Sequence, residues 1–293
     1  MSLPTFVGIG VPRAGTTWLH AVLESHPEVY VPQRRKELYF FNLYYDRGVS
    51  WYKKFFPPDS EAGRYRAIGE ITPHYFYGST CPERMAKLPV EKLLLMLRNP
   101  IDRAYSYYAL KVRDGIFWGT FEEFLREWPV IEQGYYTRYL ENYLQYFDRD
   151  QILILIYETA LRDVDHTQCL LAQFLSISPE KFSPAAGDQI VNPSYVPKAR
   201  RAYGVAFRVS RVLREWDLDW VVNAAKRLGV KEAFGVAGKA PPMLEETRAE
   251  LTREYEDEVD ALEQFLGVSL DVWRNGQVEA PLDPVAEVQG SRR

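Results

Sequence analysis

GIGVPRAGTTWL, residues 8–19, is a glycine-rich turn between a short apolar run and a segment with helical spacing. The pattern predicts a strand over Thr5–Ile9 and a helix over Thr16–Ser25. A turn that leads into a helix presents free backbone N–H groups and the positive end of the helix dipole. We therefore expect this segment to bind an anion.

The segment differs from the phosphate-binding loop of nucleotide triphosphatases, G-x-x-x-x-G-K-[ST], whose lysine reaches the β- and γ-phosphates. Gly10 and Gly15 have the separation of that loop, but Thr16 stands where the lysine would be and Arg13 supplies a cation inside the loop. No apolar run ends in an acidic pair that would hold Mg²⁺. We therefore expect no metal site and no tight binding of a γ-phosphate.

Buried strands alternate with helices along the chain, which is typical of a parallel sheet with crossover helices. The sequence predicts an α/β fold: a single P-loop-like domain over residues 1–275, with a central parallel sheet flanked by helices on both faces, and a frayed tail over residues 276–293. The other expected strands are Arg66–Ile71, which is the weakest, Glu91–Leu97 and Gln151–Ile156. The other expected helices are Ile101–Arg113, with Pro100 in its first turn, Tyr135–Phe147, Asp165–Leu175 and Pro242–Leu266, whose apolar stripe is Leu244, Leu251, Tyr255, Val259 and Leu262.

Composition and charge narrow the classes of function. The chain has 293 residues, 46% of them hydrophobic and 26% charged, as in ordinary globular proteins. A formal net charge of −4 does not favour a nucleic-acid partner, so an anion site must be local. The N-terminus has no basic signal-peptide region, and no apolar run reaches the roughly 18 residues of a membrane span. We expect a soluble cytoplasmic protein; the oligomeric state is unknown.

A second candidate anion site lies at the end of another expected strand. Arg98 follows the strand Glu91–Leu97, and Ser106 lies two turns into the next helix. Arg98 could instead cap a helix or pair with an acid. However, ligands of parallel sheets bind beyond the carboxyl ends of the strands, where the two sites would converge. Two such sites suit a ligand with two phosphate-like groups.

PRAGTTWL (residues 12–19) followed by LRNPIDRAYSYY (residues 97–108) resembles the motif pair of sulfotransferases that use 3′-phosphoadenosine 5′-phosphosulfate (PAPS). The similarity spans nearly the whole chain and includes KELYFF (residues 36–41), GEITPHYF (residues 69–76) and FLGVSLDVW (residues 265–273). The set is more similar to bacterial sulfotransferases related to the heparan-sulfate type than to the mammalian cytosolic type. The ligand of the first loop would then be a phosphosulfate, which has no γ-phosphate.

The resemblance implies a donor site for PAPS, with adenosine 3′,5′-bisphosphate (PAP) as the product and no metal. In sulfotransferases, an arginine and a serine eight residues later bind the 3′-phosphate, and here these are Arg98 and Ser106. A basic segment closes over the 3′-phosphate and adenine; its position holds Lys198, Arg200 and Arg201, which could equally be a solvated loop. Trp18 would stack on the adenine or pack in the core. The 5′-phosphosulfate loop comprises Arg13, Ala14, Gly15, Thr16, Thr17 and Trp18.

Sulfuryl transfer to a hydroxyl needs a base for its proton and cations for the leaving group, by analogy with phosphoryl transfer. In the heparan-sulfate group the glutamate of K-E-x-x-F-F resembles the catalytic base, which implies Glu37. Lys36 would hold that glutamate or assist the transferring group; both could instead belong to a solvated charge run. Many relatives have lysine where Arg13 stands. Arg13 can stabilise charge there, but an arginine pKa above 12 argues against proton donation.

His74 is the rival base. It lies where cytosolic sulfotransferases keep their catalytic histidine, and histidine titrates near neutrality. Relatives of the heparan-sulfate type lack a histidine there, so His74 could contact the acceptor instead. We favour Glu37. Glu70 would orient a cation in this region or form a structural salt bridge.

Two other functions remain open. A P-loop kinase is opposed by the missing lysine and Mg²⁺ site, and a catalytically silent nucleotide-binding protein of this fold is opposed by Glu37 and the Arg98–Ser106 pair. The acceptor is a small molecule or a carbohydrate. An aromatic segment at Tyr39–Tyr52 suits either, or belongs to the core, and Arg34 and Arg35 hint at an anionic acceptor.

Overall fold

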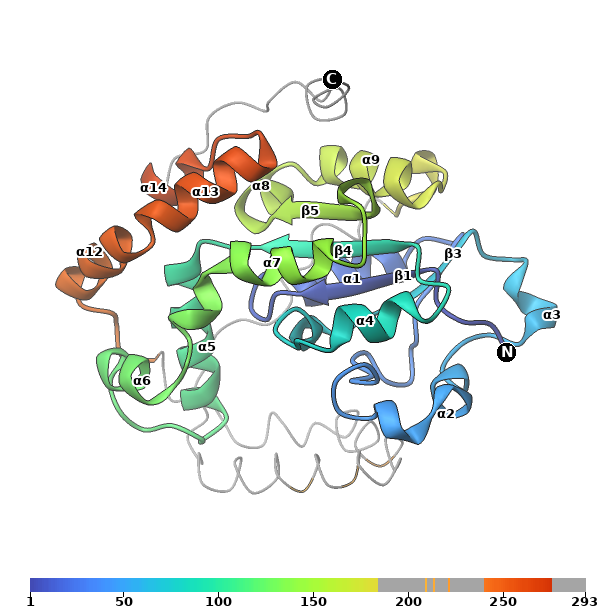
Figure 1. Ribbon diagram of the computed structural model, residues 1–293, viewed down its shortest axis with the longest axis horizontal. Coiled ribbons are helices and arrows are strands. Elements are labelled where there is room, and N and C mark those ends of the chain that lie inside the picture. The colour runs from blue at the N-terminus through green and yellow to red at the C-terminus, as the bar shows by residue number, and fades with distance from the viewer. Residues whose placement is uncertain (184–208, 210–212, 214–220, 222–239, 276–293) are drawn as a thin grey trace.

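The computed structural model describes residues 1–183, 209, 213, 221 and 240–275 (Figure 1). Its centre is a parallel sheet of five strands in the order β2-β3-β1-β4-β5. β1 lies in the middle, paired with β3 on one side and β4 on the other, and every residue of β1 is buried. The strands are β1 (Phe6–Gly10), β2 (Val29–Tyr30), β3 (Ala67–Ile71), β4 (Lys92–Leu97) and β5 (Ile152–Ile156).

Helices cover both faces of this sheet: Figure 1 shows α4 and α7 on the near side and α1 on the far side. The predicted α/β class, with a parallel sheet between helices, is confirmed. The helices are α1 (Thr16–Glu24), α2 (Val49–Lys53), α3 (Asp59–Ala62), α4 (Cys81–Ala86), α5 (Pro100–Arg113), α6 (Phe121–Glu127), α7 (Tyr136–Leu144), α8 (Tyr157–Arg162), α9 (Val164–Leu175), α12 (Glu245–Glu254), α13 (Glu256–Leu266) and α14 (Asp271–Asn275).

The prediction of one continuous helix over Pro242–Leu266 is wrong. The chain makes two helices there, α12 and α13, separated at Tyr255, whose φ of −97° and ψ of 6° are not helical. The ring of Tyr255 is buried, and its hydroxyl donates to the carbonyl of Ile131 at 2.9 Å. Leu244 is 53% exposed instead of continuing the buried stripe, because it precedes the first turn of α12.

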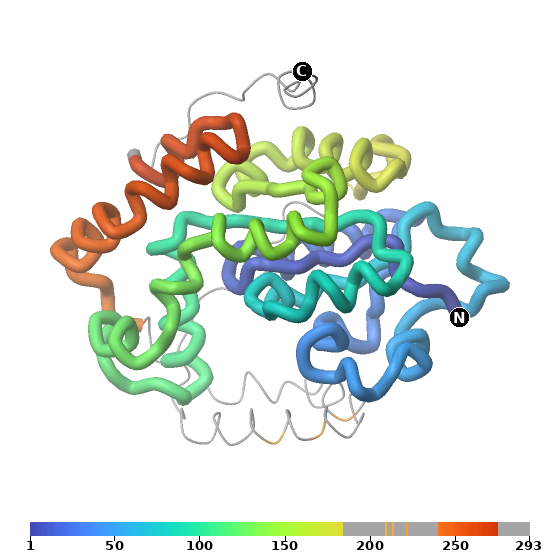
Figure 2. The backbone as a smooth tube through the Cα atoms, in the orientation of Figure 1, coloured from blue at the N-terminus to red at the C-terminus, as the bar shows by residue number. Residues whose placement is uncertain are grey.

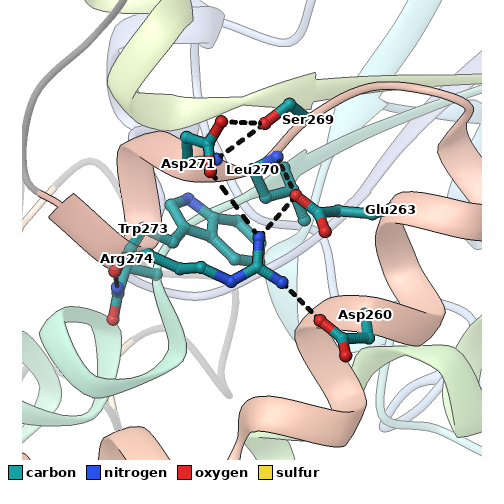
Figure 3. A network of polar contacts seen from close by, with 8 residues as sticks. Asp260, Glu263, Ser269, Leu270, Asp271, Trp273 and Arg274 are labelled. Atoms are coloured by element: carbon teal, nitrogen blue, oxygen red, sulfur yellow. Dashed lines mark hydrogen bonds and ion pairs between the residues drawn. The ribbon is translucent and has the colours of Figure 1, made fainter.

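The last described helix, α14, is held by a cluster of ion pairs around Arg274 (Figure 3). The guanidinium of Arg274 contacts Asp260 on α13 and lies 2.7 Å from Glu263. Glu263 also accepts from the backbone N–H of Leu270 at 2.6 Å. These contacts close the turn between α13 and α14 and fix the position of Trp273.

Trp273 ties this C-terminal segment to the end of β4. Its indole N–H donates to Glu158 at 2.9 Å, and its carbonyl accepts from the Asn99 side chain at 2.9 Å. Glu158 in turn accepts from the backbone N–H of Asn99 at 3.0 Å. In Figure 2 the orange-red tube of residues 240–275 accordingly runs back to the region of α5 and β5. The three residues hold the peptide that follows Arg98.

Candidate active site

The glycine-rich loop ends at Gly15, which is the N-cap of α1. Gly15 has φ 79°, and a Cβ there would lie 2.7 Å from the ring of Tyr157 at the start of α8. Both the backbone conformation and the close approach therefore require glycine. Ala14 and Thr16 are buried, so these residues offer an anion mainly their backbone N–H groups.

Three predicted donor-site residues form a chain of contacts across the carboxyl ends of β1 and β4. Nε of Arg13 donates to Oγ of Ser106 at 3.0 Å. Arg98 donates from its guanidinium to the carbonyl of Arg13 at 3.0 Å, and it lies over the Tyr157 ring, 4.6 Å from the centroid. The structure thus brings together cations that are 85 residues apart in the sequence.

The region around Arg13, Arg98 and Ser106 is electropositive and contains a hydrogen-bond donor without a partner among the described residues. Burial, together with the nearby charges of Arg113 and Arg98, lowers the pKa of Arg13 to about 10. This value is still well above 7, so Arg13 remains charged at neutral pH. Nε of Arg98 is buried and has no hydrogen-bond partner among the described residues. An unpaired buried donor is costly, and a phosphate oxygen would satisfy it. The residues present therefore fit the phosphate groups of the predicted donor.

Lys36 connects the glycine-rich loop to the predicted base. Its ammonium donates to Oγ1 of Thr17 at 2.7 Å and lies 3.7 Å from Oε1 of Glu37. Burial lowers the pKa of Lys36; the Glu37 carboxylate opposes that shift, and Arg13 adds to it. One cation thus lies between the loop that would hold the donor and the carboxylate that would activate the acceptor.

Tyr39 connects Glu37 and His74, because its hydroxyl lies near both side chains. The Tyr39 hydroxyl donates to Oε2 of Glu37 and lies 3.4 Å from Nδ1 of His74. Burial lowers the pKa of His74, with Glu37 opposing and Lys111 adding to the shift, so the imidazole is neutral at pH 7. Tyr39 was expected only as part of the aromatic segment Tyr39–Tyr52 and not as a partner of Glu37, although it stands two residues after Glu37 in the KELYFF motif.

The contacts described above do not include the remaining residues that were expected at the site. Trp18 is only 3% exposed, which fits the packing alternative better than an open platform for adenine. Lys198, Arg200 and Arg201 lie outside the described residues. Glu70 is fully buried, and its hydrogen-bond donors in the described structure are hydroxyl groups, so the expected cation or salt bridge is wrong.

A cavity of about 560 Å³ lies beside the edge strand β2. Tyr30, Phe55 and Tyr65 line it together with Arg34 and Lys54. Its lining includes neither the glycine-rich loop nor the Lys36–Glu37 pair. The cavity is therefore separate from the cluster at the carboxyl ends of the strands.

The part of the chain that the structure describes has neither a metal-ligand cluster nor a membrane-spanning helix. Residues 1–183 and 240–275, with the three isolated ones, contain no group of three or more His, Cys, Asp or Glu side chains placed to hold a metal ion. Within the same part of the chain, no helix has the length and apolar character needed to cross a membrane.

Comparison with known proteins points to one family. The model of the sulfotransferase domain matches residues 4–203. The chain is 30% identical over 198 residues to a Bos taurus bifunctional heparan sulfate N-deacetylase/N-sulfotransferase 2, covering 60% of this chain but 22% of the relative. It is 36% identical over 114 residues to the Dictyostelium discoideum membrane-associated sulfotransferase kil1, covering 39% of this chain and 24% of that protein. The chain therefore spans about a quarter of the length of these relatives.

A solved structure extends the similarity to most of the chain. The crystal structure of a sulfotransferase from Alicyclobacillus acidocaldarius superposes with a TM-score of 0.66 at 25% identity. The match covers 94% of this chain and all of the other. The overall fold described above is therefore that of a sulfotransferase.

Proposed function

Because the chain belongs to the sulfotransferase domain family, we propose that it moves a sulfuryl group from PAPS to a hydroxyl or amine of an acceptor. The family match confirms the resemblance that the motif pair indicated. The observation that carries the reaction is the position of Lys36, which contacts Thr17 of the donor loop and faces Glu37. The sulfuryl group passes from the donor to an acceptor oxygen that lies beside the base, and a cation between the donor loop and the base stabilises its charge.

The donor is held at the carboxyl ends of β1 and β4. The backbone of the glycine-rich loop and the first turn of α1 bind the 5′-phosphosulfate, with Thr16 and Thr17 adding hydroxyl groups. Arg98 and Ser106 bind the 3′-phosphate, supported by the buried Nε of Arg98. Arg13 neutralises charge on the leaving phosphate as a fixed cation. We propose that the domain spans residues 1–275; the tail expected over residues 276–293 lies outside the described residues.

Glu37 is the base in this proposal. Its side chain is 31% exposed, so an acceptor can reach it, and it lies beside the cation that contacts the donor loop. His74 contacts this pair through Tyr39, and we place it where it would orient the acceptor. A carboxylate accepts the proton of the acceptor hydroxyl as the oxygen attacks sulfur, and the PAP phosphate leaves on the opposite side.

The acceptor is a small molecule or a carbohydrate. The heparan sulfate sulfotransferases among the relatives favour a carbohydrate, since their names describe a sulfated polysaccharide as substrate. Arg34, which precedes the base loop and lines the cavity beside β2, would suit an anionic chain. We also propose a cytoplasmic location and no nucleic-acid partner.

Calorimetry and a transfer assay test this function together. We expect PAP to bind the purified protein and ATP to bind much more weakly, because the loop has Thr16 in place of the triphosphate lysine. We also expect a sulfo group from labelled PAPS to appear on at least one member of a panel of carbohydrate and phenolic acceptors. Tight binding of Mg²⁺–ATP would favour the kinase alternative, and PAP binding without any transfer would favour the silent one.

Transfer should not require a metal ion. We propose this because Arg13 lies in the glycine-rich loop and Lys36 contacts it, so that cations of the protein can neutralise the charge for which a kinase uses lysine and Mg²⁺. Excess EDTA should leave the initial rate of sulfuryl transfer unchanged. A rate that disappears with EDTA and returns with added Mg²⁺ would contradict the proposal.

A further inference from the structure

A fully buried carboxylate, Glu70, lies near the end of β3, next to the predicted site. It accepts hydrogen bonds from three hydroxyl groups: Oγ1 of Thr72 at 2.7 Å, and the phenols of Tyr75 at 2.7 Å and Tyr52 at 3.0 Å. Burial raises the pKa of Glu70 to about 7, and the three hydroxyl groups oppose that shift. Such a carboxyl group is costly in a protein interior, where an apolar side chain of similar volume would serve packing.

Two of these hydroxyl groups also bind the loop that carries Lys36 and Glu37. Oγ1 of Thr72 accepts from the backbone N–H of Leu38 at 2.9 Å. The Tyr75 hydroxyl accepts from the backbone N–H of Phe40 at 2.8 Å. Glu70 therefore supports this loop indirectly, through the hydroxyl groups of Thr72 and Tyr75. The supported amides, those of Leu38 and Phe40, follow closely after the predicted base.

The direction of the hydrogen bonds explains why a carboxylate suits this position. A hydroxyl has one hydrogen and two acceptor sites, and the ionised form of the Glu70 carboxyl group, which predominates above about pH 7, can only accept. When Thr72 and Tyr75 give their hydrogens to Glu70, their oxygens must face donors, and the amides of Leu38 and Phe40 are those donors. The carboxylate thus sets the orientation of both hydroxyl groups, which in turn set the backbone of the loop.

We propose that Glu70 is a positioning residue for sulfuryl transfer, which acts through Thr72 and Tyr75 to hold the loop that presents Lys36 and Glu37. This inference rests on the proposed function for the identity of the transfer step. Glu70 contacts neither donor nor acceptor in this account; it keeps the base and the cation at their places beside Thr17. Misplacement of a catalytic group by about 1 Å can cost about 10²-fold in rate.

Glu70→Gln tests this role while preserving the shape of the side chain. The amide group of glutamine would donate to Thr72 instead of accepting from it, so the Thr72 hydrogen loses its acceptor. We expect kcat to fall by about 10- to 10²-fold, with the affinity for PAP unchanged, because the donor loop is not touched. Thr72→Val should give the same split between kcat and PAP affinity, and Thr72→Ser, which keeps the hydroxyl, should restore the rate.

A matched pair of tyrosine variants separates positioning from stability. Tyr75→Phe and Tyr255→Phe each remove one buried hydroxyl that bonds to backbone, but Tyr255 bonds to Ile131, away from the base loop. We expect both variants to lower Tm by similar amounts and only Tyr75→Phe to lower kcat. Equal losses of kcat in both would overturn the proposal, because they would show a general effect of lost stability.

Hydrogen exchange of the Leu38 and Phe40 amides, read by NMR, tests the inference without any turnover. Both amides should be protected in the wild-type protein, and Glu70→Gln should accelerate their exchange by at least about 10-fold relative to core amides of β4. Unchanged exchange, or wild-type kcat in Glu70→Gln, would overturn the positioning role. If the wild type transfers no sulfuryl group, the proposed function fails, whereas the exchange result still decides whether Glu70 holds the loop.

Discussion

Glu37→Gln is expected to lower turnover by about 10²-fold or more while the affinity for PAP stays within about twofold of the wild type. Glutamine has the shape of glutamate and can still accept from Tyr39, but it cannot take the proton of the acceptor hydroxyl. The loss therefore isolates the chemical role of the carboxylate. Steady-state kinetics with PAPS and calorimetry with PAP measure the two quantities on the same preparation.

His74→Asn is the matched comparison for this experiment. Asparagine can occupy the place of Nδ1 near the Tyr39 hydroxyl, so the cluster keeps a polar partner there. We expect this variant to raise the KM for the acceptor and to leave most of kcat intact. If Glu37→Gln keeps near-full turnover and His74→Asn abolishes it, the two residues exchange roles.

The pH profile discriminates less well between these two residues. A histidine base at its reference pKa of about 6.5 would lose activity on mild acidification. However, burial lowers the pKa of His74, so a histidine base here would also remain active at mildly acidic pH. The paired variants are therefore the decisive measurement.

Arg98→Ala is expected to weaken PAP binding by about 1.5–3 kcal/mol, or about 10- to 150-fold in Kd. The variant loses a charge-assisted bond to the 3′-phosphate and also the bond that holds the carbonyl of Arg13. Calorimetric titration with PAP measures the change, and a thermal melt checks that the protein remains folded.

Two further variants make this result specific. Arg126→Ala removes the same charge from an exposed position on α6, and its affinity for PAP should equal that of the wild type. Arg98→Lys keeps the charge but loses the planar fork, so its affinity should be intermediate. Wild-type affinity in Arg98→Ala would remove this residue from the donor site.

The sequence by itself predicted the fold class, and it predicted that the glycine-rich loop and Arg98 converge at the carboxyl ends of the strands, where the structure places them. Short apolar runs identify buried strands locally, and β1, β4 and β5 lie within one residue of the predicted ranges. The proposed donor residues are short-range signals too: Gly15 ends a turn, and the spacing of Arg98 and Ser106 places the first just before α5 and the second two turns into it. Such features depend on neighbours in the chain, which a sequence displays directly.

The tertiary structure alone decided the rest. β2 has only two residues, too few for a hydrophobic pattern, and it forms because β3 pairs with it. The bend at Tyr255 depends on packing against a distant segment, and Trp273 reaches Asn99 across 174 residues. The bonds from the base loop to the hydroxyl groups of Thr72 and Tyr75 likewise span 34 and 35 residues of sequence. Hydrogen bonds between segments that only folding brings together leave no periodicity in the sequence, so the supports of the site became visible only in three dimensions.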